Sequence, residues 1–340
     1  MKINLKHVSL FSLFILLTLT LSLNGAYGWF GNHRPAPPST TAAITVGSGP
    51  WAVAFDSNKN EVFVANSNVN TVSVINDATN LVTATITVGN GPDGVAFDSN
   101  KNEVFVVNLN DNTVSVINDL TNGVTTTITL GSGPDGVGFD SNLNEIFVGN
   151  GLTNTVSVIS DSTNTVIKTI TVGASPPVFA FDPHNHEMYV ANTGYYGGGH
   201  WHGDTVSVIN DLTNGVIATI TVGYCPFAVA FDSNNNELYV ANMYSATVSV
   251  ISAATNTVIK TIAGQSGPMG VAFDSHNNQV YVVNCFSSTV SVISDATNTV
   301  TRTLTGFNNP VAIAFDSHTN QLFIANYGSG TGDTVSVIPG

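Results

Sequence analysis

The chain has few charged residues and few cysteines, and both scarcities narrow the range of functions. Only 9% of its 340 residues are Asp, Glu, Lys or Arg, and eight basic residues stand against 22 acidic ones. The formal net charge of −14 would repel a phosphate backbone, so we expect no nucleic-acid partner. Two cysteines, Cys225 and Cys285, are too few for disulfides to form the main scaffold.

The sequence also lacks a convincing helical period, a phosphate-binding loop and a nucleophile–base pairing among its motifs. Val, Ile and Thr are abundant, and these residues favour strands because branching at Cβ suits a packed, pleated surface. Asn, Asp and Gly, which favour turns, separate these apolar stretches. The composition therefore predicts β structure, and the motifs identify no catalytic residue.

A motif close to Gly-Pro-x-x-Val-x-Phe-Asp recurs seven times. Successive copies lie 42 residues apart, except for one interval of 50 residues. The Phe positions of the seven copies are Phe55, Phe97, Phe139, Phe181, Phe231, Phe273 and Phe315. A period of about 40–45 residues with strand-like content is typical of propeller blades, so we predict an all-β, seven-bladed β-propeller.

The first repeat divides into four predicted antiparallel strands at residues 52–56, 61–66, 71–75 and 81–88. The seventh repeat ends after its third strand, at residues 334–338. A matching fourth strand lies before the first repeat, at residues 42–47. We therefore predict that this N-terminal strand completes the last blade and closes the ring.

The second-strand sequence Val-Phe-Val-Ala-Asn at residues 62–66, with relatives at 189–192 and 239–242, resembles the YVTN-repeat β-propellers. The resemblance covers residues 42–340 and implies a surface-layer-like or extracellular binding module. Related seven-bladed folds include lactonases, streptogramin lyases and peptidylglycine lyases, so the resemblance leaves enzymatic activity open.

The N-terminal segment differs from the repeats. Lys2 and Lys6 precede an apolar run at residues 8–23, and Ala26-Tyr27-Gly28 follows it. We interpret residues 1–28 as a signal peptide, 29–41 as a linker and 42–340 as the propeller, which predicts a secreted or cell-surface protein. An uncleaved membrane anchor is the alternative, although sixteen residues are short for a span.

Two polar residues recur in every repeat, and we interpret both as structural. We expect the Asp after each motif Phe, such as Asp56, to accept backbone hydrogen bonds in the following turn. A ring of carboxylates that attracts cations is the alternative. We expect the Asn that ends each second strand, such as Asn66, to fix the next turn in the same way.

The fourth repeat contains an insertion, residues 193–204, that accounts for the 50-residue interval. Function concentrates on loops carried by a rigid scaffold, so this loop and the aromatic residues predicted on the same face of blades 4–6 form our candidate ligand-binding site. Its members are Tyr195, Tyr196, Trp201, Tyr224, Phe227, Tyr244 and Phe286. We expect a non-enzymatic interaction module whose partner is a cell-envelope protein or a glycan. In the alternative, the insertion simply covers the channel.

Within the insertion, His200, His202 and Asp204 form a candidate site for a divalent metal, since alternate residues of an extended segment project to one side. Otherwise we expect no cofactor. A metal-dependent lyase or lactonase with its site at this face or at the channel mouth is the alternative function. Cys225 and Cys285 fall on the same predicted face, and the sequence leaves open whether they are bonded.

Asp93 and Asp135 directly follow the motif prolines of adjacent blades, at the predicted channel mouth. A lactonase-like calcium site would need such oxygen ligands. The equivalent residues of the other blades are apolar, and we therefore expect no full cage of oxygen ligands there; they are Trp51, Pro177, Phe227, Met269 and Val311.

Overall fold

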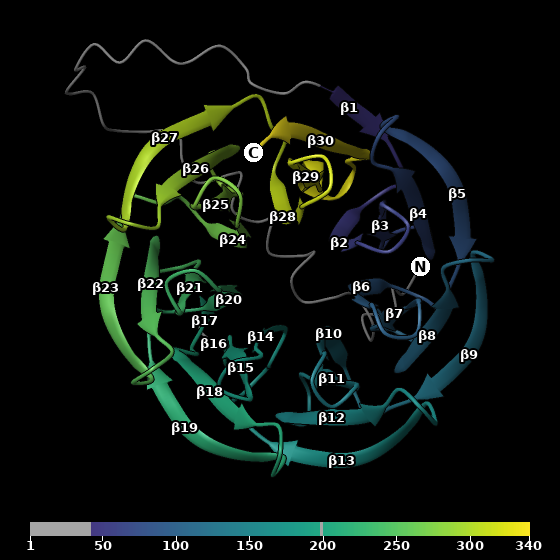
Figure 1. Cartoon of the computed structure of the whole chain (residues 1–340), viewed down its shortest axis with the longest axis horizontal. Coiled ribbons are helices and arrows are strands. Elements are labelled where there is room, and N and C mark those ends of the chain that lie inside the picture. The colour runs from purple at the N-terminus through teal and green to yellow at the C-terminus, as the bar shows by residue number, and fades with distance from the viewer. Residues whose placement is uncertain (1–41, 198–199) are drawn as a thin grey trace, which may run out of the picture.

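The computed structural model describes residues 42–197 and 200–340, so the predicted signal peptide and linker lie outside the described residues. Seven four-stranded antiparallel sheets stand around a central channel (Figure 1). The one helical turn among the described residues is a short 3-10 turn, Gly328–Gly330. No helix in this part of the chain is long and apolar enough to span a membrane. The predicted seven-bladed β-propeller is confirmed.

Each blade runs outward from the channel in the same strand order. The innermost strands are β2 (Pro50–Asp56), β6 (Pro92–Asp98), β10 (Pro134–Asp140), β14 (Val178–Asp182), β20 (Pro226–Asp232), β24 (Pro268–Asp274) and β28 (Pro310–Asp316). The second strands are β3 (Glu61–Asn66), β7 (Glu103–Asn108), β11 (Glu145–Asn150), β15 (Glu187–Asn192), β21 (Glu237–Asn242), β25 (Gln279–Asn284) and β29 (Gln321–Asn326). The strands predicted for the first blade agree with the observed ones to within two residues.

The outer half of each blade follows the same pattern. The third strands are β4 (Thr71–Asn76), β8 (Thr113–Asn118), β12 (Thr155–Ser160), β18 (Thr205–Asn210), β22 (Thr247–Ser252), β26 (Thr289–Ser294) and β30 (Thr334–Pro339). The outermost strands are β5 (Leu81–Thr87), β9 (Gly123–Thr129), β13 (Thr165–Thr171), β19 (Gly215–Thr221), β23 (Thr257–Ala263), β27 (Thr299–Thr305) and β1 (Ala42–Thr45).

The N-terminal strand closes the ring, as the sequence predicted. β1 pairs antiparallel with β30, and Ile44 lies opposite Val335. The Ile44 side chain is buried in a cluster that includes Val335 and Val337 of the last blade and Val62 of the first. The backbone N–H of Val46 also donates to the carbonyl of Asp333 at 2.7 Å. The first and last described segments thus share one sheet.

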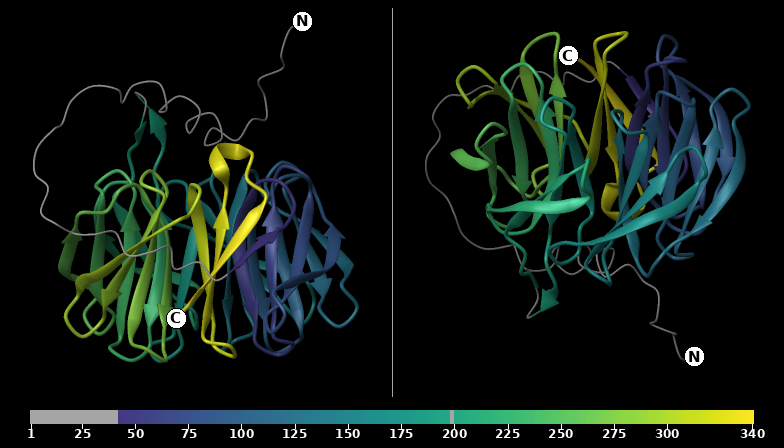
Figure 2. Two further views of the ribbon diagram at one scale, coloured as in Figure 1. Left: turned by 90° about the horizontal axis from the view of Figure 1, so that it is seen from above. Right: turned by 60° about the horizontal axis from the view of Figure 1, so that its bottom comes forward.

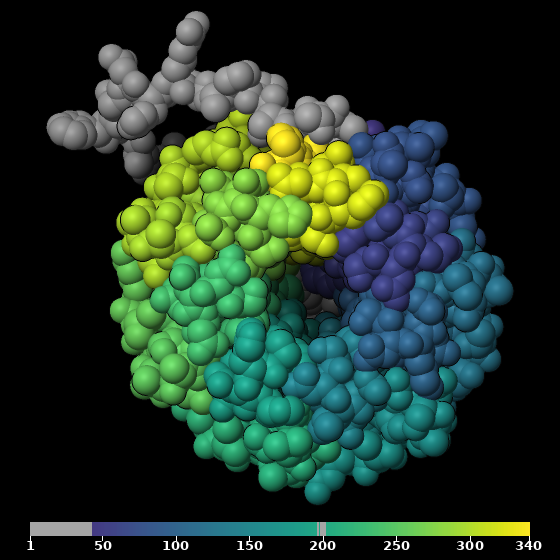
Figure 3. Space-filling model, in the orientation of Figure 1, coloured from purple at the N-terminus to yellow at the C-terminus, as the bar shows by residue number. Residues whose placement is uncertain are grey.

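The core lies between the blades and not within any one of them. Phe63, Val72 and Val74 of the first blade pack in one buried cluster with Val104 and Val106 of the second. The middle strands are therefore buried on both faces, whereas the outermost strands are largely exposed. The innermost strands border the channel, which appears as the central hollow in Figure 3.

The recurring Asp residues support the turns, as expected. Oδ1 of Asp56 accepts hydrogen bonds from the N–H groups of Asn58 (2.8 Å) and Lys59 (3.0 Å). The same pair of bonds recurs at the other six positions, Asp98, Asp140, Asp182, Asp232, Asp274 and Asp316. In all seven blades Oδ1 of the recurring Asp is therefore hydrogen-bonded within its own turn.

The recurring Asn residues join the second strand to the third. Nδ2 of Asn66 donates to Oγ1 of Thr71 and to Oγ of Ser73, at 3.1 and 3.0 Å. Its side chain is buried, and a Cβ added at Gly47 would approach it within 2.6 Å. Asn66 is therefore a buried polar link across the turn, and Gly47 leaves room for it.

The ring has two chemically different faces. The connections between second and third strands, and the entries to the innermost strands, make up one face, which we call the loop face. The Asp-containing turns make up the opposite, turn face. There, Nδ2 of Asn58 donates to the carbonyl of Ser99 and to Oδ1 of Asn102 in the next blade, both at 2.7 Å.

Several carboxyl groups on the turn face are buried close to one another. Burial, with a further contribution from the neighbouring Asp56, raises the pKa of Asp119 to about 6, although Lys59 lowers it. Burial likewise raises the pKa of Asp140 to about 6, and nearby Asp211 adds to the rise. These groups favour the fold most when they carry a proton.

The ring closure predicts an uneven response along β1. Ile44→Ala should lower the free energy of unfolding by about 2–4 kcal/mol, because it removes buried contacts between the two ends of the ring. Thr45→Ala, at the exposed neighbouring position, should change it by less than about 0.5 kcal/mol. Thermal unfolding of both variants measures the difference, and equal effects would contradict a closing role for β1.

The raised carboxyl pKa values predict stability that increases on mild acidification. An Asp whose folded pKa exceeds its unfolded value of about 4 contributes stability below pH 4, which is lost as the pH rises through about 6. We therefore expect Tm to fall between about pH 5 and pH 7.5. Scanning calorimetry across this range tests the sign. Asp119→Asn should flatten the profile, and an unchanged profile in that variant would rule out Asp119 as a contributor.

Candidate functional site

The blade 4 insertion forms a short hairpin that stands out from the loop face. Its strands are β16 (Tyr196–Gly197) and β17 (His200–Trp201), and they pair antiparallel. Figure 2 shows this hairpin projecting away from the ring, so its strands do not lie across the channel mouth. The side chains of Tyr196, His200 and Trp201, all predicted site residues, lie outside the described part of the structure.

Two glycines close the base of the hairpin. The N–H of Gly203 donates to the carbonyl of Thr193 at 2.8 Å. Gly194 has a φ of +89°, and a Cβ at Gly203 would lie 2.2 Å from the Asn192 carbonyl oxygen. The carbonyl of Gly203 in turn accepts the N–H of Cys225 at 2.7 Å, which ties the hairpin to blade 5.

Three of the predicted aromatic residues are exposed on the loop face. Tyr195, Tyr224 and Phe286 have relative exposures of 65%, 59% and 48%. The Tyr195 ring stacks on His202, with centroids 4.8 Å apart and planes inclined by 21°. The Phe286 ring lies over Gly267, where an added Cβ would approach it within 2.5 Å. We call Tyr195, Tyr224 and Phe286 the rim aromatics.

Phe227 and Tyr244, also predicted as site residues, are less exposed than the rim aromatics. Both are half-buried and pack against an apolar cluster of blades 5–7, whose buried members are Cys225, Met243, Met269, Cys285, Val311, Ala325 and Tyr327. The structure therefore divides the predicted aromatic set into an exposed rim and a packed inner part.

The two cysteines belong to the same buried cluster and are not bonded to each other. Burial raises the pKa of the Cys225 thiol to about 12 and that of Cys285 to about 11, although Asn309 lowers the latter. Nδ2 of Asn309 lies 3.0 Å from Sγ of Cys285. Protonated, buried thiols of this kind are packing residues and not nucleophiles.

The candidate metal ligands are only partly described. Nε2 of His202 lies 2.8 Å from the carbonyl oxygen of Gly197 and donates a hydrogen bond to it. Asp204 is half-buried just before β18. No three His, Cys, Asp or Glu side chains cluster as a metal site among the described residues, which do not include the imidazole of His200.

A second candidate site lies at the mouth of the channel, where each innermost strand begins. The β2–β3 register shifts between Pro50 and Ala52, so Trp51 is an extra residue in a β-bulge. Related shifts occur at Asp93, Asp135, Phe227, Met269 and Val311. Bulges redirect side chains, and these residues line a central cavity of about 160 Å³.

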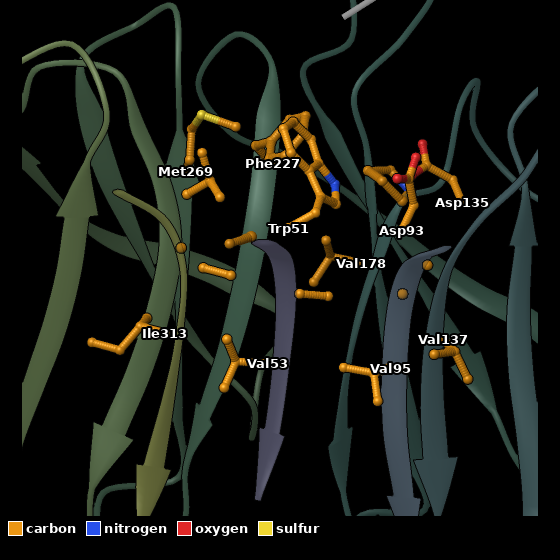
Figure 4. Close-up of a pocket in the computed structure, with 18 of the residues that line it drawn as sticks. Trp51, Val53, Asp93, Val95, Asp135, Val137, Val178, Phe227, Met269 and Ile313 are labelled. Carbon is orange, nitrogen blue, oxygen red and sulfur yellow. The ribbon is translucent and has the colours of Figure 1, made fainter. Parts of the chain in front are cut away.

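The channel mouth has one acidic side and one apolar side. Figure 4 shows the carboxyl groups of Asp93 and Asp135 turned toward each other, with Trp51, Phe227 and Met269 elsewhere around the mouth. Trp51 packs edge-on against Tyr327, with ring centroids 4.9 Å apart. Figure 4 places Val53, Val95, Val137 and Ile313 deeper in the channel, and the aliphatic lining also includes Val178, Val229 and Val271.

Glycine allows the two acidic blades to approach closely. A Cβ at Gly94 would lie 2.9 Å from the carbonyl oxygen of Asp135, and one at Gly136 would lie 1.4 Å from that of Pro177. The Asp-Gly pairs of blades 2 and 3 therefore bring Asp93 and Asp135 together at adjacent positions of the ring.

The environment of this pair favours protonation. Burial raises the pKa of Asp135 to about 6. Burial, followed by repulsion from Asp135, raises the pKa of Asp93 well above its usual range. Each side chain keeps some exposed surface, but that surface faces the narrow channel while protein surrounds it on the other sides.

Comparison with known proteins supports the fold. Residues 206–328 match the model of a family described as YNCE-like beta-propeller, which is consistent with a YVTN-type propeller. A solved chain of Kuenenia stuttgartiensis hydrazine synthase is similar in structure, with a TM-score of 0.75 and 15% identity over 92% of this chain and 99% of that one. At this identity the likeness shows the fold alone. No curated protein matches the sequence.

The close packing at the base of the hairpin predicts that a side chain added at Gly203 will destabilise the protein. Gly203→Ala should destabilise the protein by about 1–3 kcal/mol and increase chymotryptic cleavage at Tyr195, because the new methyl group collides with backbone. Gly215→Ala is the matched control, since its Cβ would meet only Oγ1 of Thr213, at 3.5 Å. Thermal unfolding and limited proteolysis measure both effects. If Gly203→Ala is tolerated as well as Gly215→Ala, the described base of the hairpin is wrong.

Proposed function

We propose that this chain is a secreted or cell-surface β-propeller that acts as a non-enzymatic interaction module through the loop face of blades 4–6. The observation that carries the proposal is the exposure of the three rim aromatics, Tyr195, Tyr224 and Phe286, on one face of a closed ring. Exposed aromatic side chains offer large contact areas at low conformational cost, and aromatic residues dominate the energetics of many interfaces.

The scaffold suits this role because it holds the rim in place. Packing between blades fixes the loop face, and a backbone hydrogen bond from Cys225 to Gly203 joins the entry of blade 5 to the base of the hairpin. The N–H of Tyr224 donates to Oγ of Ser245 at 2.7 Å, and the N–H of Tyr244 donates to the Tyr224 carbonyl at 3.3 Å. Such support limits the ordering cost of binding.

We propose a cell-envelope glycan or protein as the partner. Stacking of a sugar ring on Tyr224 or Phe286 and insertion of these rings into a protein pocket are both compatible with their exposure. The apolar segment at residues 8–23 supports export. A metal-dependent lyase or lactonase is the alternative. The described residues contain no cluster of three potential metal ligands to support it, and similarity to a 15% identical propeller shows only the fold.

The proposal predicts that binding and stability respond separately to substitution. Tyr224→Ala and Phe286→Ala should each weaken partner binding about tenfold or more, because truncating an interface aromatic removes a large contact. Tm should stay within a few degrees of the parent, because both side chains are exposed. Glycan arrays and immobilised envelope proteins supply the partners, and calorimetry supplies Tm.

Leu120→Ala is the matched control, since this residue is 68% exposed in a turn of the opposite face. It should leave partner binding unchanged. Trp201→Ala extends the test to the tip of the hairpin. If the three loop-face variants, Tyr224→Ala, Phe286→Ala and Trp201→Ala, all bind a captured partner as the parent does, the loop face of blades 4–6 is not the contact surface.

A further inference from the structure

The channel mouth contains two carboxyl groups, those of Asp93 and Asp135, that form no hydrogen bond or ion pair with the described residues. In this they differ from the recurring turn carboxylates, which accept hydrogen bonds within their own turns. Protein encloses both groups, and both point into the cavity (Figure 4). Enclosing unpaired carboxylates is unfavourable, and either a proton or a bound cation would relieve the cost.

The rest of the mouth does not resemble a site for a hard metal ion. A calcium ion takes six to eight oxygen ligands. The other side chains at the channel mouth are those of Trp51, Pro177, Phe227, Met269 and Val311. No third carboxylate joins the pair among the described residues that line the cavity.

An apolar wall with aromatic rings beside a carboxylate pair suits a different kind of cation. The faces of Trp and Phe attract ammonium groups, and their surface also accommodates the apolar body of the same molecule. The sulfur and methyl groups of Met269 extend that surface. The net charge of −14 further favours the approach of cations.

The volume of the cavity limits the size of the ligand. At about 160 Å³ it is comparable to cavities of about 150 Å³ that accept benzene. The aliphatic ring formed by Val53, Val95, Val137 and their equivalents lies below the mouth. A charged head group would therefore remain beside Asp93 and Asp135, and only an apolar part would extend inward.

We propose that the channel mouth is a binding site for a small organic cation, an amine with an apolar body about the size of a benzene ring. Its ammonium group contacts Asp93 and Asp135, and its apolar body packs against Trp51, Phe227 and Met269. This site is separate from the rim aromatics, so its function goes beyond the proposed contact of the loop face and can be tested independently.

The pair also predicts how binding depends on pH. Asp93 and Asp135 are the titratable side chains among the described residues that line the cavity, and burial raises the pKa of both. A bound ammonium group stabilises the ionised carboxylates, so it displaces a proton from the pair. Affinity should therefore increase as the pH rises from about 5 to 7.5.

Isothermal titration of the purified protein tests the proposal, with benzylammonium as the probe. Benzyl alcohol, which has a similar shape and no charge, should bind at least about tenfold more weakly. At pH 6.5, titrations in buffers of different ionisation enthalpy should show release of protons on binding. Equal affinity for the two probes, or no saturable binding of benzylammonium, would overturn the proposal.

Substitutions locate the site. Asp93→Asn and Asp135→Asn should each weaken benzylammonium binding about tenfold or more. Each should leave Tm at pH 7.5 unchanged or higher, because repulsion within the pair is removed. Asp333→Asn removes an exposed carboxylate of the same face and should bind as the parent does. Binding that survives both Asp93→Asn and Asp135→Asn would place the ammonium elsewhere.

Two further titrations separate this site from its alternatives. Calcium ions that bind with one-to-one stoichiometry and block benzylammonium would identify a metal site, and would overturn the assignment to an organic cation. Tyr224→Ala should retain full benzylammonium affinity, since Tyr224 does not line the cavity. The proposal for the rim aromatics and the proposal for the channel mouth can therefore be contradicted independently of each other.

Discussion

Each blade depends on its two neighbours to bury its apolar surface. The buried side chains of β3 and β4 pack against those of the next blade, so no blade has a complete core of its own. A ring of this kind is stable only when it is closed, and β1 provides the closure by completing the sheet of the last blade. The uniformity of the repeats follows from this constraint, since each interface must fit the same neighbouring surface.

The same constraint determines where the sequence is free to vary. In six of the seven blades the residue after the motif proline lies in a bulge at the channel mouth and takes little part in packing between the outer strands, and its identity varies among Trp, Asp, Phe, Met and Val. The loops between second and third strands are a second such region, and blade 4 accommodates an additional hairpin there. Both regions lie on the loop face, which concentrates chemical variety on one side of the ring.

Much of the fold could be predicted from the sequence because its signals are local and repeated. The motif spacing gave the number of blades, and the displaced strand at residues 42–47 indicated how the ring closes. The depth of individual side chains could not be predicted in this way. Tyr224 and Tyr244 look alike in sequence, but Tyr224 is exposed whereas Tyr244 packs against a cluster formed by three blades. Asp93 and Asp135 were recognisable as neighbours, whereas their lack of hydrogen-bond partners depends on bulge geometry that the sequence does not specify.

The pairing of β1 with β30 also has a consequence for the order of events in folding. Synthesis produces β1 first and β30 last, so β1 remains without its partner while nearly 290 residues are added between them. Contacts this distant in sequence form slowly, because a long loop must be closed before they stabilise anything. Until then, the facing surfaces of the first and last blades are apolar and exposed to solvent. A chaperone would have to shield these surfaces.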